Sequence, residues 1–188
     1  MNKEEFIKDF KEVKLGGISH KIFKNVFQPT PSLETMLQFV EDSKAKGTYR
    51  SDREGFYIIH SHDPSDFEGY GAYDDFLSAA RTVYTDLDEM QNFGTTMVAS
   101  EKYRAIVPVS GIMRHTDQTD TVHWTTSGAT IWRIFDKDGE HEYVVEAGDI
   151  FYVKHEIEHE VESLTPRAGI VLSAGKYSQE FLDKQENK

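Results

Sequence analysis

The sequence has no cysteine, no long hydrophobic run and no cluster of basic residues. Without cysteine there is no disulfide, no thiolate zinc site and no cysteine nucleophile, which is compatible with a reducing compartment, so we expect a cytoplasmic protein. No apolar run approaches the roughly 18 residues of a membrane span. The acidic beginning of the chain, Met1–Glu5, also lacks the apolar core of a signal peptide. We therefore expect no association with a membrane.

Acidic residues outnumber basic ones, with 33 Asp and Glu against 21 Lys and Arg and a formal net charge of −12 over 188 residues. A protein that follows a phosphate backbone needs clustered Lys and Arg, so nucleic acid is not an expected partner. The simplest consequence of the acidity is solubility, and attraction of a basic peptide partner is the alternative.

The pattern of apolar residues changes near residue 95. Before it, helical spacing predicts three helices, and a short apolar run predicts one strand. After it, segments rich in Thr, Val and Ile alternate with turn signals such as Asp136–Gly139. The expected helices are 4–13, for which an ordered arm is the alternative, 32–45 and 73–90. The expected strands are 55–59, 96–99, 103–109, 121–126, 130–135, 142–145, 150–153 and 168–173.

Short strands at this spacing predict a closed or sandwiched all-β core. We expect a mainly β protein with flanking helices, in which a helical amino-terminal half (1–94) packs on a β-barrel (95–176) and a short tail (177–188) follows. The whole forms one structural domain. The helical half has two candidate roles, shaping a substrate groove or forming the face of a homodimer, and the sequence does not decide between them.

The most informative motif is His115-Thr116-Asp117, with His159 further along the chain. On an extended strand, an imidazole and a carboxylate two residues apart face the same side. Two His and one carboxylate on one face of a metal, with open positions opposite, are the ligands of non-haem Fe(II) oxygenases. The alternative is a loop in which His115 and Asp117 pair with each other or with Arg114.

The order of motifs around this triplet resembles the double-stranded β-helix (cupin) oxygenases that use Fe(II) and 2-oxoglutarate, in particular their Jumonji-like hydroxylases. Residues 128–132 read Gly-Ala-Thr-Ile-Trp, and a Gly-Asp turn then precedes His159. The resemblance covers residues 105–173 and implies a double-stranded β-helix (jelly-roll) barrel. It also implies that His115, Asp117 and His159 bind Fe(II), with 2-oxoglutarate as cosubstrate.

One position departs from the pattern of that family. A basic residue two places after the glycine usually binds the far carboxylate of 2-oxoglutarate, but Thr130 stands there, and a hydroxyl cannot neutralise a carboxylate. Arg167 resembles the Arg that follows the distal His in the prolyl-hydroxylase branch, and a guanidinium suits a carboxylate. The alternative for Arg167 is a surface ion pair. Arg133 is a weaker candidate, because strand alternation sets it opposite Thr130 and Trp132.

Three further side chains are candidates for the substrate pocket, namely His123, Trp124 and Trp132. Aromatic side chains are more often part of a core than of a substrate platform. Because neighbouring residues of a strand face opposite sides, only one of His123 and Trp124 should point into the barrel.

Two other histidine patterns suggest different chemistry. The run His155–His159 reads His-Glu-Ile-Glu-His and matches the pattern of zinc peptidases, which requires a helix. Residues 151–161 instead alternate between apolar or His and polar side chains, which favours a strand. His60 and His62, followed by Glu68, loosely resemble the first metal motif of small cupins, and a solvated loop is the favoured alternative.

The spacing of the three residues supports a metal site, and the resemblance implies an Fe(II)-dependent oxygenase, using 2-oxoglutarate, that hydroxylates a protein side chain or a small metabolite. The alternative is a metal-binding cupin without oxygenase activity, such as an isomerase or a small-molecule binding module, which Thr130 keeps open. A zinc peptidase is the third hypothesis.

Overall fold

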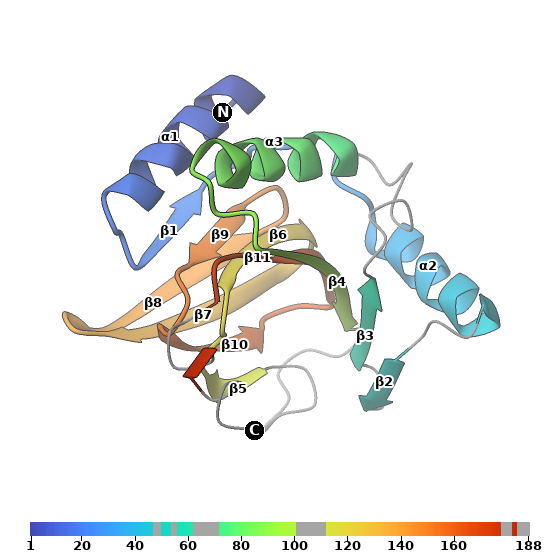
Figure 1. Cartoon of the computed structure of the whole chain (residues 1–188). Coiled ribbons are helices and arrows are strands. Elements are labelled where there is room, and N and C mark those ends of the chain that lie inside the picture. Colours follow the sequence, from blue (N-terminus) through green and yellow to red (C-terminus); the bar gives the residue numbers. More distant parts are fainter. Residues whose placement is uncertain (47–49, 54–55, 62–71, 101–111, 178–181, 184–188) are drawn as a thin grey trace.

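The computed structural model describes residues 1–46, 50–53, 56–61, 72–100, 112–177 and 182–183 (Figure 1). Within these residues, helices α1, α2 and α3 accompany two β-sheets. The helices are α1 (Lys3–Leu15), α2 (Leu33–Lys46) and α3 (Tyr73–Asp86). The strands are β1 (His20–Phe23), β2 (Arg50–Arg53), β3 (Phe56–Ser61), β4 (Asn92–Ser100), β5 (Ile112–His115), β6 (Asp120–Ser127), β7 (Ala129–Asp136), β8 (Gly139–Glu146), β9 (Ile150–Val153), β10 (Glu158–Ser163) and β11 (Arg167–Gly175).

The two sheets pack against each other through their inner faces. The larger sheet has the strand order β1-β9-β6-β11-β4-β3-β2, and the smaller has the order β5-β10-β7-β8. The described strand pairs are antiparallel. Between the sheets, Trp132 and Ile134 of β7 belong to the same buried cluster as Phe151 and Val153 of β9. The mainly β architecture is therefore as predicted.

The helices cover the opposite face of the larger sheet (Figure 1). Strand β6 shows how the sheet separates the two sides. Val122 and Trp124 belong to the core beneath the helices, whereas Thr121 and His123 line a cavity on the inner face. This is the period-two alternation of a strand buried on both faces.

Aromatic packing holds α1 on the sheet. Phe6 and Phe10 are fully buried, and the ring of Phe10 lies edge-on to those of Tyr152 in β9 and Tyr84 in α3. The helix begins at a capping box, in which Asn2 accepts from the Glu5 amide and Glu5 accepts from the Asn2 amide, both at 2.9 Å. Such a cap contributes about 1 kcal/mol, so local and tertiary signals agree at this helix.

The first 94 residues are less helical than expected. The three predicted helices are present, but β1, β2 and β3 also lie in this part of the chain and extend the larger sheet at both edges. Of these, only β3 is close to a predicted strand. Strands β1 and β2 have four residues each, which is too short for alternation to identify. The strand expected at 103–109 lies outside the described residues.

The predicted alternation over residues 151–161 is divided between two strands. β9 ends at Val153, a turn covers residues 154–157, and β10 begins at Glu158. Glu156 in this turn has a φ of 63°, which lies in the left-handed region and ends the extended conformation. Because β9 belongs to the larger sheet and β10 to the smaller, the chain changes sheets here.

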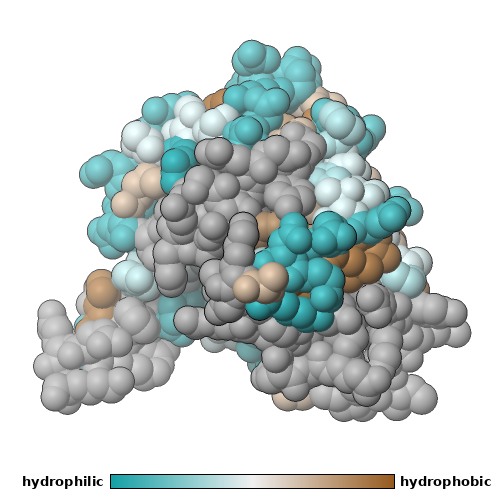
Figure 2. Space-filling view, turned by 90° about the vertical axis from the view of Figure 1, so that its right-hand side faces the viewer, coloured by the Kyte–Doolittle hydropathy of each residue, from teal (hydrophilic) through white to brown (hydrophobic). Residues whose placement is uncertain are grey.

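Hydrophilic side chains predominate among the described residues at the top of the view in Figure 2, and a small hydrophobic patch reaches the surface near its middle. This surface agrees with the acidic, highly charged composition of the chain. None of the helices in the described part of the chain has both the length and the apolar character needed to cross a membrane.

Candidate metal centre

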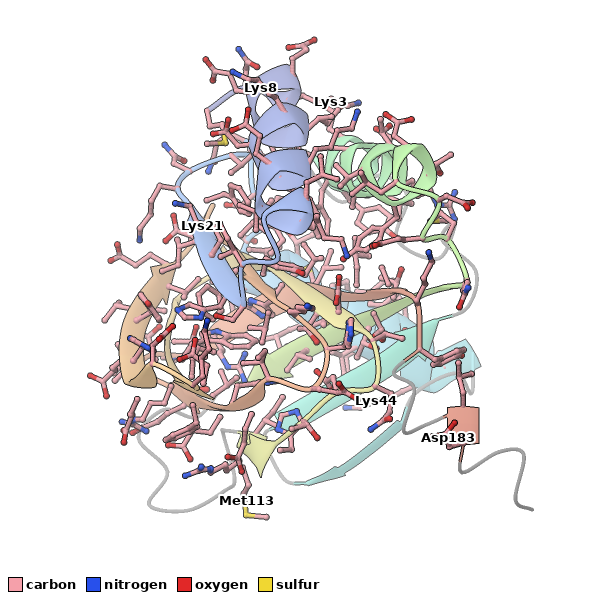
Figure 3. The ribbon with its side chains drawn as sticks, turned by 60° about the vertical axis from the view of Figure 1, so that its left-hand side comes forward. Lys3, Lys8, Lys21, Lys44, Met113 and Asp183 are labelled. Carbon is pink, nitrogen blue, oxygen red and sulfur yellow. The ribbon has the colours of Figure 1, made fainter. Side chains whose placement is uncertain are left out.

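Strand pairing brings two of the predicted ligands together. In the smaller sheet His115 of β5 lies directly opposite His159 of β10, and their ring centroids are 4.4 Å apart. Further along, Val161 pairs with Ile112, so β5 contains one residue more than β10 over this stretch. Such a bulge shifts which side chains face inward. As a result both Ile112 and His115 line the cavity, while Met113 between them points away from the barrel (Figure 3).

Asp117 completes the group from a loop rather than from the strand. β5 ends at His115, so the two residues do not share a strand face as the sequence predicts. Nevertheless Asp117 Oδ1 lies 3.6 Å from His115 Nε2, and its Oδ2 lies 3.5 Å from His159 Nε2. The candidate ligand atoms of the three residues all lie within 4.8 Å of one another. The residues predicted as a triad therefore meet in space.

Both imidazoles are oriented as metal ligands usually are. Nδ1 of His115 donates to the Met113 carbonyl oxygen at 2.7 Å, and Nδ1 of His159 donates to the Ile157 carbonyl oxygen at 2.9 Å. A carbonyl can only accept, so each Nδ1 carries the proton and each Nε2 is left bare beside Asp117. Burial lowers the pKa of His159, which favours the neutral imidazole that a metal requires.

The side chain of Asp117 is held by the neighbouring strand. Thr121 Oγ1 donates to Asp117 Oδ2, and the amide of Glu156 donates to the Asp117 carbonyl oxygen at 3.0 Å. Sequence inspection missed Thr121, although its position two residues before His123 places it on the same face of the strand.

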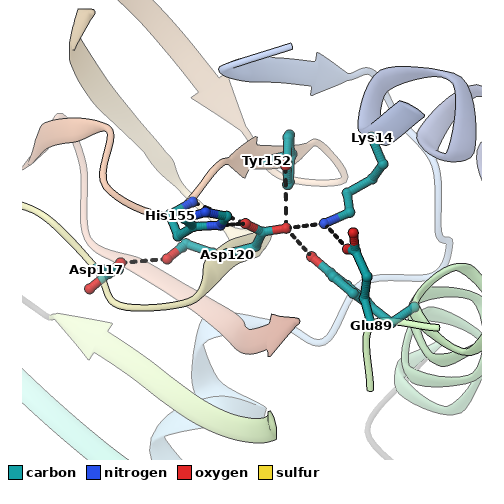
Figure 4. Close-up of polar contacts among 8 residues, drawn as sticks. Lys14, Glu89, Asp117, Asp120, Tyr152 and His155 are labelled. Carbon is teal, nitrogen blue, oxygen red and sulfur yellow. Dashed lines mark hydrogen bonds and ion pairs between the residues drawn. The ribbon is translucent and has the colours of Figure 1, made fainter. Parts of the chain in front are cut away.

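A buried carboxylate lies behind this loop (Figure 4). Asp120 is 1% exposed, and its Oδ1 accepts from both the backbone amide and Nδ1 of His155, at 3.0 and 2.9 Å. Its Oδ2 accepts from Tyr84 and Tyr152 at 3.2 and 3.3 Å and forms an ion pair with Lys14 of α1. Burial alone would raise the pKa of Asp120, but the hydrogen bonds from His155 and the charge and hydrogen bond of Lys14 outweigh it and lower the pKa to about 2.

The three side chains face a cavity of about 190 Å³ between the two sheets, which has mostly apolar walls. Arg167 lines the same cavity, is 1% exposed, and donates from Nε to Ser163 Oγ at 2.7 Å. Burial lowers the pKa of Arg167 to about 10, so the guanidinium stays charged at neutral pH. The cavity thus has a carboxylate and two imidazoles in one part of its wall and a guanidinium in another.

The other predicted pocket residues separate into two groups. His123 and Trp132 line the cavity, and the Trp132 ring stacks on His159 at a centroid distance of 5.6 Å. Trp124 points the other way and packs with Phe76 under the helices. Trp124 is therefore a core residue, as its alternation with His123 requires.

The two alternatives to Arg167 do not face the cavity. Thr130 is buried, its hydroxyl lies 3.5 Å from the Val145 carbonyl oxygen, and it is not among the described residues that line the cavity. Arg133 makes ion pairs with Glu142, Glu160 and Glu162. Arg133 thus lies on the face opposite Trp132, as strand alternation predicted, whereas its Glu160 partner follows from the register of β7 and β10, which the sequence does not reveal.

The zinc-peptidase hypothesis is contradicted by the backbone. Residues 154–157 form a turn, so His155 and His159 do not share a helical face, and the ring of His155 is bonded to Asp120. In the third histidine pattern, His62 and Glu68 lie outside the described residues.

No family model matches the chain, and no curated protein matches it in sequence. Its fold is similar to that of solved prolyl hydroxylases. A prolyl-4-hydroxylase from Pseudomonas putida has a TM-score of 0.63 at 17% identity, covering 91% of this chain and 100% of the other. A Trichoplax adhaerens prolyl hydroxylase in complex with a peptide fragment of hypoxia inducible factor has a TM-score of 0.65 at 14% identity, covering 92% and 90%. KdgF from Halomonas has a TM-score of 0.44 at 13% identity, covering 68% of this chain and 87% of the other.

The two prolyl hydroxylases place the chain in the double-stranded β-helix, or cupin-type, fold. At this level of identity the likeness concerns the fold alone. The Jumonji-like branch stays a prediction.

Proposed function

We propose that this chain is a non-haem Fe(II)-dependent oxygenase that uses 2-oxoglutarate to hydroxylate a C–H bond. One observation carries the proposal: the bare Nε2 atoms of His115 and His159 converge on the Asp117 carboxylate at the wall of a cavity that also contains a buried guanidinium. Two imidazoles and one carboxylate are the ligand set of such enzymes.

The residues present fit a divalent ion. The bonds from Nδ1 to the carbonyls of Met113 and Ile157 fix the tautomer that leaves Nε2 free, and Thr121 orients the carboxylate. When bound, Fe(II) with 2-oxoglutarate supplies the activation of O₂. The chain's own part is to hold these groups in place and to keep water out through apolar neighbours such as Trp132 and Val161.

Arg167 is the residue that we propose for the far carboxylate of 2-oxoglutarate. It is the described cation that lines the cavity, and its bond to Ser163 fixes the direction of its guanidinium. Thr130 does not line the cavity, so the absence of a basic residue at position 130 is no argument against 2-oxoglutarate. Arg167, which does line the cavity, can bind the far carboxylate instead.

The substrate that we propose is a protein side chain or a small metabolite. The peptide bound by the Trichoplax adhaerens neighbour supports the first of these. A metal-binding cupin without oxygenase activity is the outcome to expect if the metal binds and 2-oxoglutarate does not.

The test is anaerobic binding. Calorimetry should show Fe(II) binding to the wild type and not to a His115→Ala, Asp117→Ala double variant, with His141→Ala on β8 as a control that leaves the cavity intact. Adding 2-oxoglutarate to the Fe(II) form should produce a visible charge-transfer band, and Arg167→Met should weaken it without changing Fe(II) affinity. Equal Fe(II) binding by the double variant would rule the proposal out.

A further inference from the structure

A third histidine lies in the cavity wall, and it is not one of the candidate metal ligands. His123, at the centre of β6, is 2% exposed and lines the cavity. Its Nδ1 lies 3.2 Å from Thr125 Oγ1, whereas its Nε2 is buried and has no hydrogen-bond partner among the described residues. Leaving a buried polar atom unbonded is costly, so an orphaned nitrogen in a cavity wall points to a ligand that bonds it.

The position of the ring follows from a missing side chain on the next strand. On β11, Arg167, Gly169 and Val171 fall on the same face by alternation, and Arg167 and Val171 line the cavity. A Cβ atom at Gly169 would lie 2.5 Å from His123 Nε2. The imidazole therefore occupies the space where a side chain of residue 169 would lie, and Arg167 is the preceding residue on the same face of β11.

The bond to Thr125 selects the tautomer. Thr125 is fully buried, and His123 is the partner recorded for its hydroxyl. If Nδ1 carried the proton, the Thr125 proton would lack an acceptor within the described part of the chain. If Nδ1 is bare, Thr125 donates to it and both groups are satisfied. The proton of the neutral ring then belongs on Nε2, which makes Nε2 a donor.

The charge of the ring also suits this role. Burial, together with the charge of Arg167, lowers the pKa of His123 to about 3, so the imidazole is neutral at physiological pH. The cavity wall then offers one cationic donor and one neutral donor side by side. That pair matches a single carboxylate, whose two oxygens accept and whose one negative charge the guanidinium balances.

We propose that His123 binds the cosubstrate as a second donor: its Nε2–H and the Arg167 guanidinium together hold the far carboxylate of a 2-oxo dicarboxylic acid. The proposal rests on the proposed function. It adds a residue by which the protein distinguishes a 2-oxo dicarboxylic acid from a 2-oxo monocarboxylic acid. Thr125 and Gly169 act through His123, the first by setting its tautomer and the second by making room for its ring.

Anaerobic calorimetry on the Fe(II)-loaded protein can test this with two acids of the same length, 2-oxoglutarate and 2-oxopentanoate, which lacks the far carboxylate. His123→Leu should weaken 2-oxoglutarate roughly 10- to 100-fold, as expected for a lost hydrogen bond to a charged group. It should leave 2-oxopentanoate unchanged. His123→Gln, which can donate from nearly the same position, should recover most of the loss. Equal weakening of both acids, or no weakening of either, would overturn the role of His123.

A measurement without metal separates this proposal from the proposed function. Nitrogen-15 spectra of the histidine rings in the metal-free wild type should show His123 as the Nε2–H tautomer, and titration with glutarate should shift its Nε2 signal. An Nδ1–H tautomer, or a signal that glutarate leaves unchanged, would refute the proposal without reference to any variant's folding. If glutarate shifts the signal but the Fe(II) form does not bind 2-oxoglutarate, the carboxylate site stands and the cosubstrate assignment falls.

Discussion

Asp120 holds the turn that follows β9 by accepting two hydrogen bonds from His155, one from its backbone amide at 3.0 Å and one from its ring at 2.9 Å. That turn contacts both sides of the candidate metal site. The Glu156 amide donates to the Asp117 carbonyl oxygen, and the Ile157 carbonyl accepts from the ring of His159. Since Lys14 of α1 pairs with the same carboxylate, the helical layer is connected to the metal ligands through one buried side chain.

Asp120→Asn should therefore lower both stability and metal affinity. Removing one partner of a buried ion pair costs about 3–5 kcal/mol in the free energy of unfolding. Urea denaturation would measure the first effect and Fe(II) calorimetry the second. Tyr84→Phe is the matched control, because it removes one donor to the other carboxylate oxygen and should cost about 1.5 kcal/mol with metal affinity unchanged. A stable Asp120→Asn variant with normal metal affinity would show that the turn needs no such support.

The pH dependence of stability should reveal the same carboxylate. The folded-state pKa of Asp120, about 2, lies below the 3.8 of an unperturbed aspartate, so its stabilisation is present above pH 3.8 and is lost as the pH falls toward 2. The whole shift corresponds to about 2 kcal/mol, and the gap in unfolding free energy between wild type and Asp120→Asn should narrow by about 1 kcal/mol between pH 6 and pH 3. Urea curves at several pH values would measure this gap. A constant gap would mean that the Asp120 pKa is not lowered by folding.

Thr121→Val should weaken metal binding without unfolding the protein. Valine keeps the shape of threonine but cannot donate to Asp117, and loss of a group that orients a ligand typically reduces metal affinity 10- to 100-fold. Thr126→Val, on the same strand, is the matched control, because Thr126 Oγ1 is buried with no partner among the described residues. Calorimetry with Fe(II) should separate the two variants. Similar affinities would mean that Asp117 does not depend on Thr121.

Gly169→Ala should disturb the His123 ring. The added methyl group would lie 2.5 Å from His123 Nε2 and 3.0 Å from the Trp124 carbonyl oxygen. Overpacking of this kind costs about 1–3 kcal/mol, and we expect weaker binding of 2-oxoglutarate as well. Gly94→Ala on β4 is the control, since nothing lies within 4 Å of the position of its Cβ. Thermal unfolding and anaerobic calorimetry on both variants would test this, and equal behaviour would show that the ring can shift without cost.

Sequence alone could predict the parts of this protein that depend on local patterns. β9 matches its predicted range of 150–153, and Asp136–Gly139 does connect β7 and β8 as a hairpin. β5, which has the same length as β9, escaped notice because its sequence Ile-Met-Arg-His has neither the continuous apolar run of β9 nor a period of two. Alternation predicts that only one of Trp124 and His123 faces the cavity. The sequence does not say which one, because that depends on which face of the sheet the helices cover.

The site shows the same division. Residue types and their order suggested the histidines and Asp117, but only the pairing of β5 with β10 brings the two rings together. Arg167 and Thr130 were both candidates for one carboxylate, and the cavity includes only Arg167. Asp120 stands three residues after Asp117, yet its partners come from distant parts of the chain, Lys14 and Tyr84 among them, so no local pattern could reveal them. The homodimer and the cytoplasmic location stay predictions.

Successive side chains of β6 and β11 point to opposite faces of the larger sheet, so the sheet separates the core under the helices from the cavity. Residues such as Trp124 and Ile170 are constrained by the helices on one side, while His123 and Arg167, their neighbours along the sheet, are constrained by whatever enters the cavity on the other. A substitution at a cavity-facing position can thus change ligand preference while the layer beneath the helices keeps its packing. The chemistry of this protein can be varied one residue at a time along a strand whose alternate residues maintain the fold.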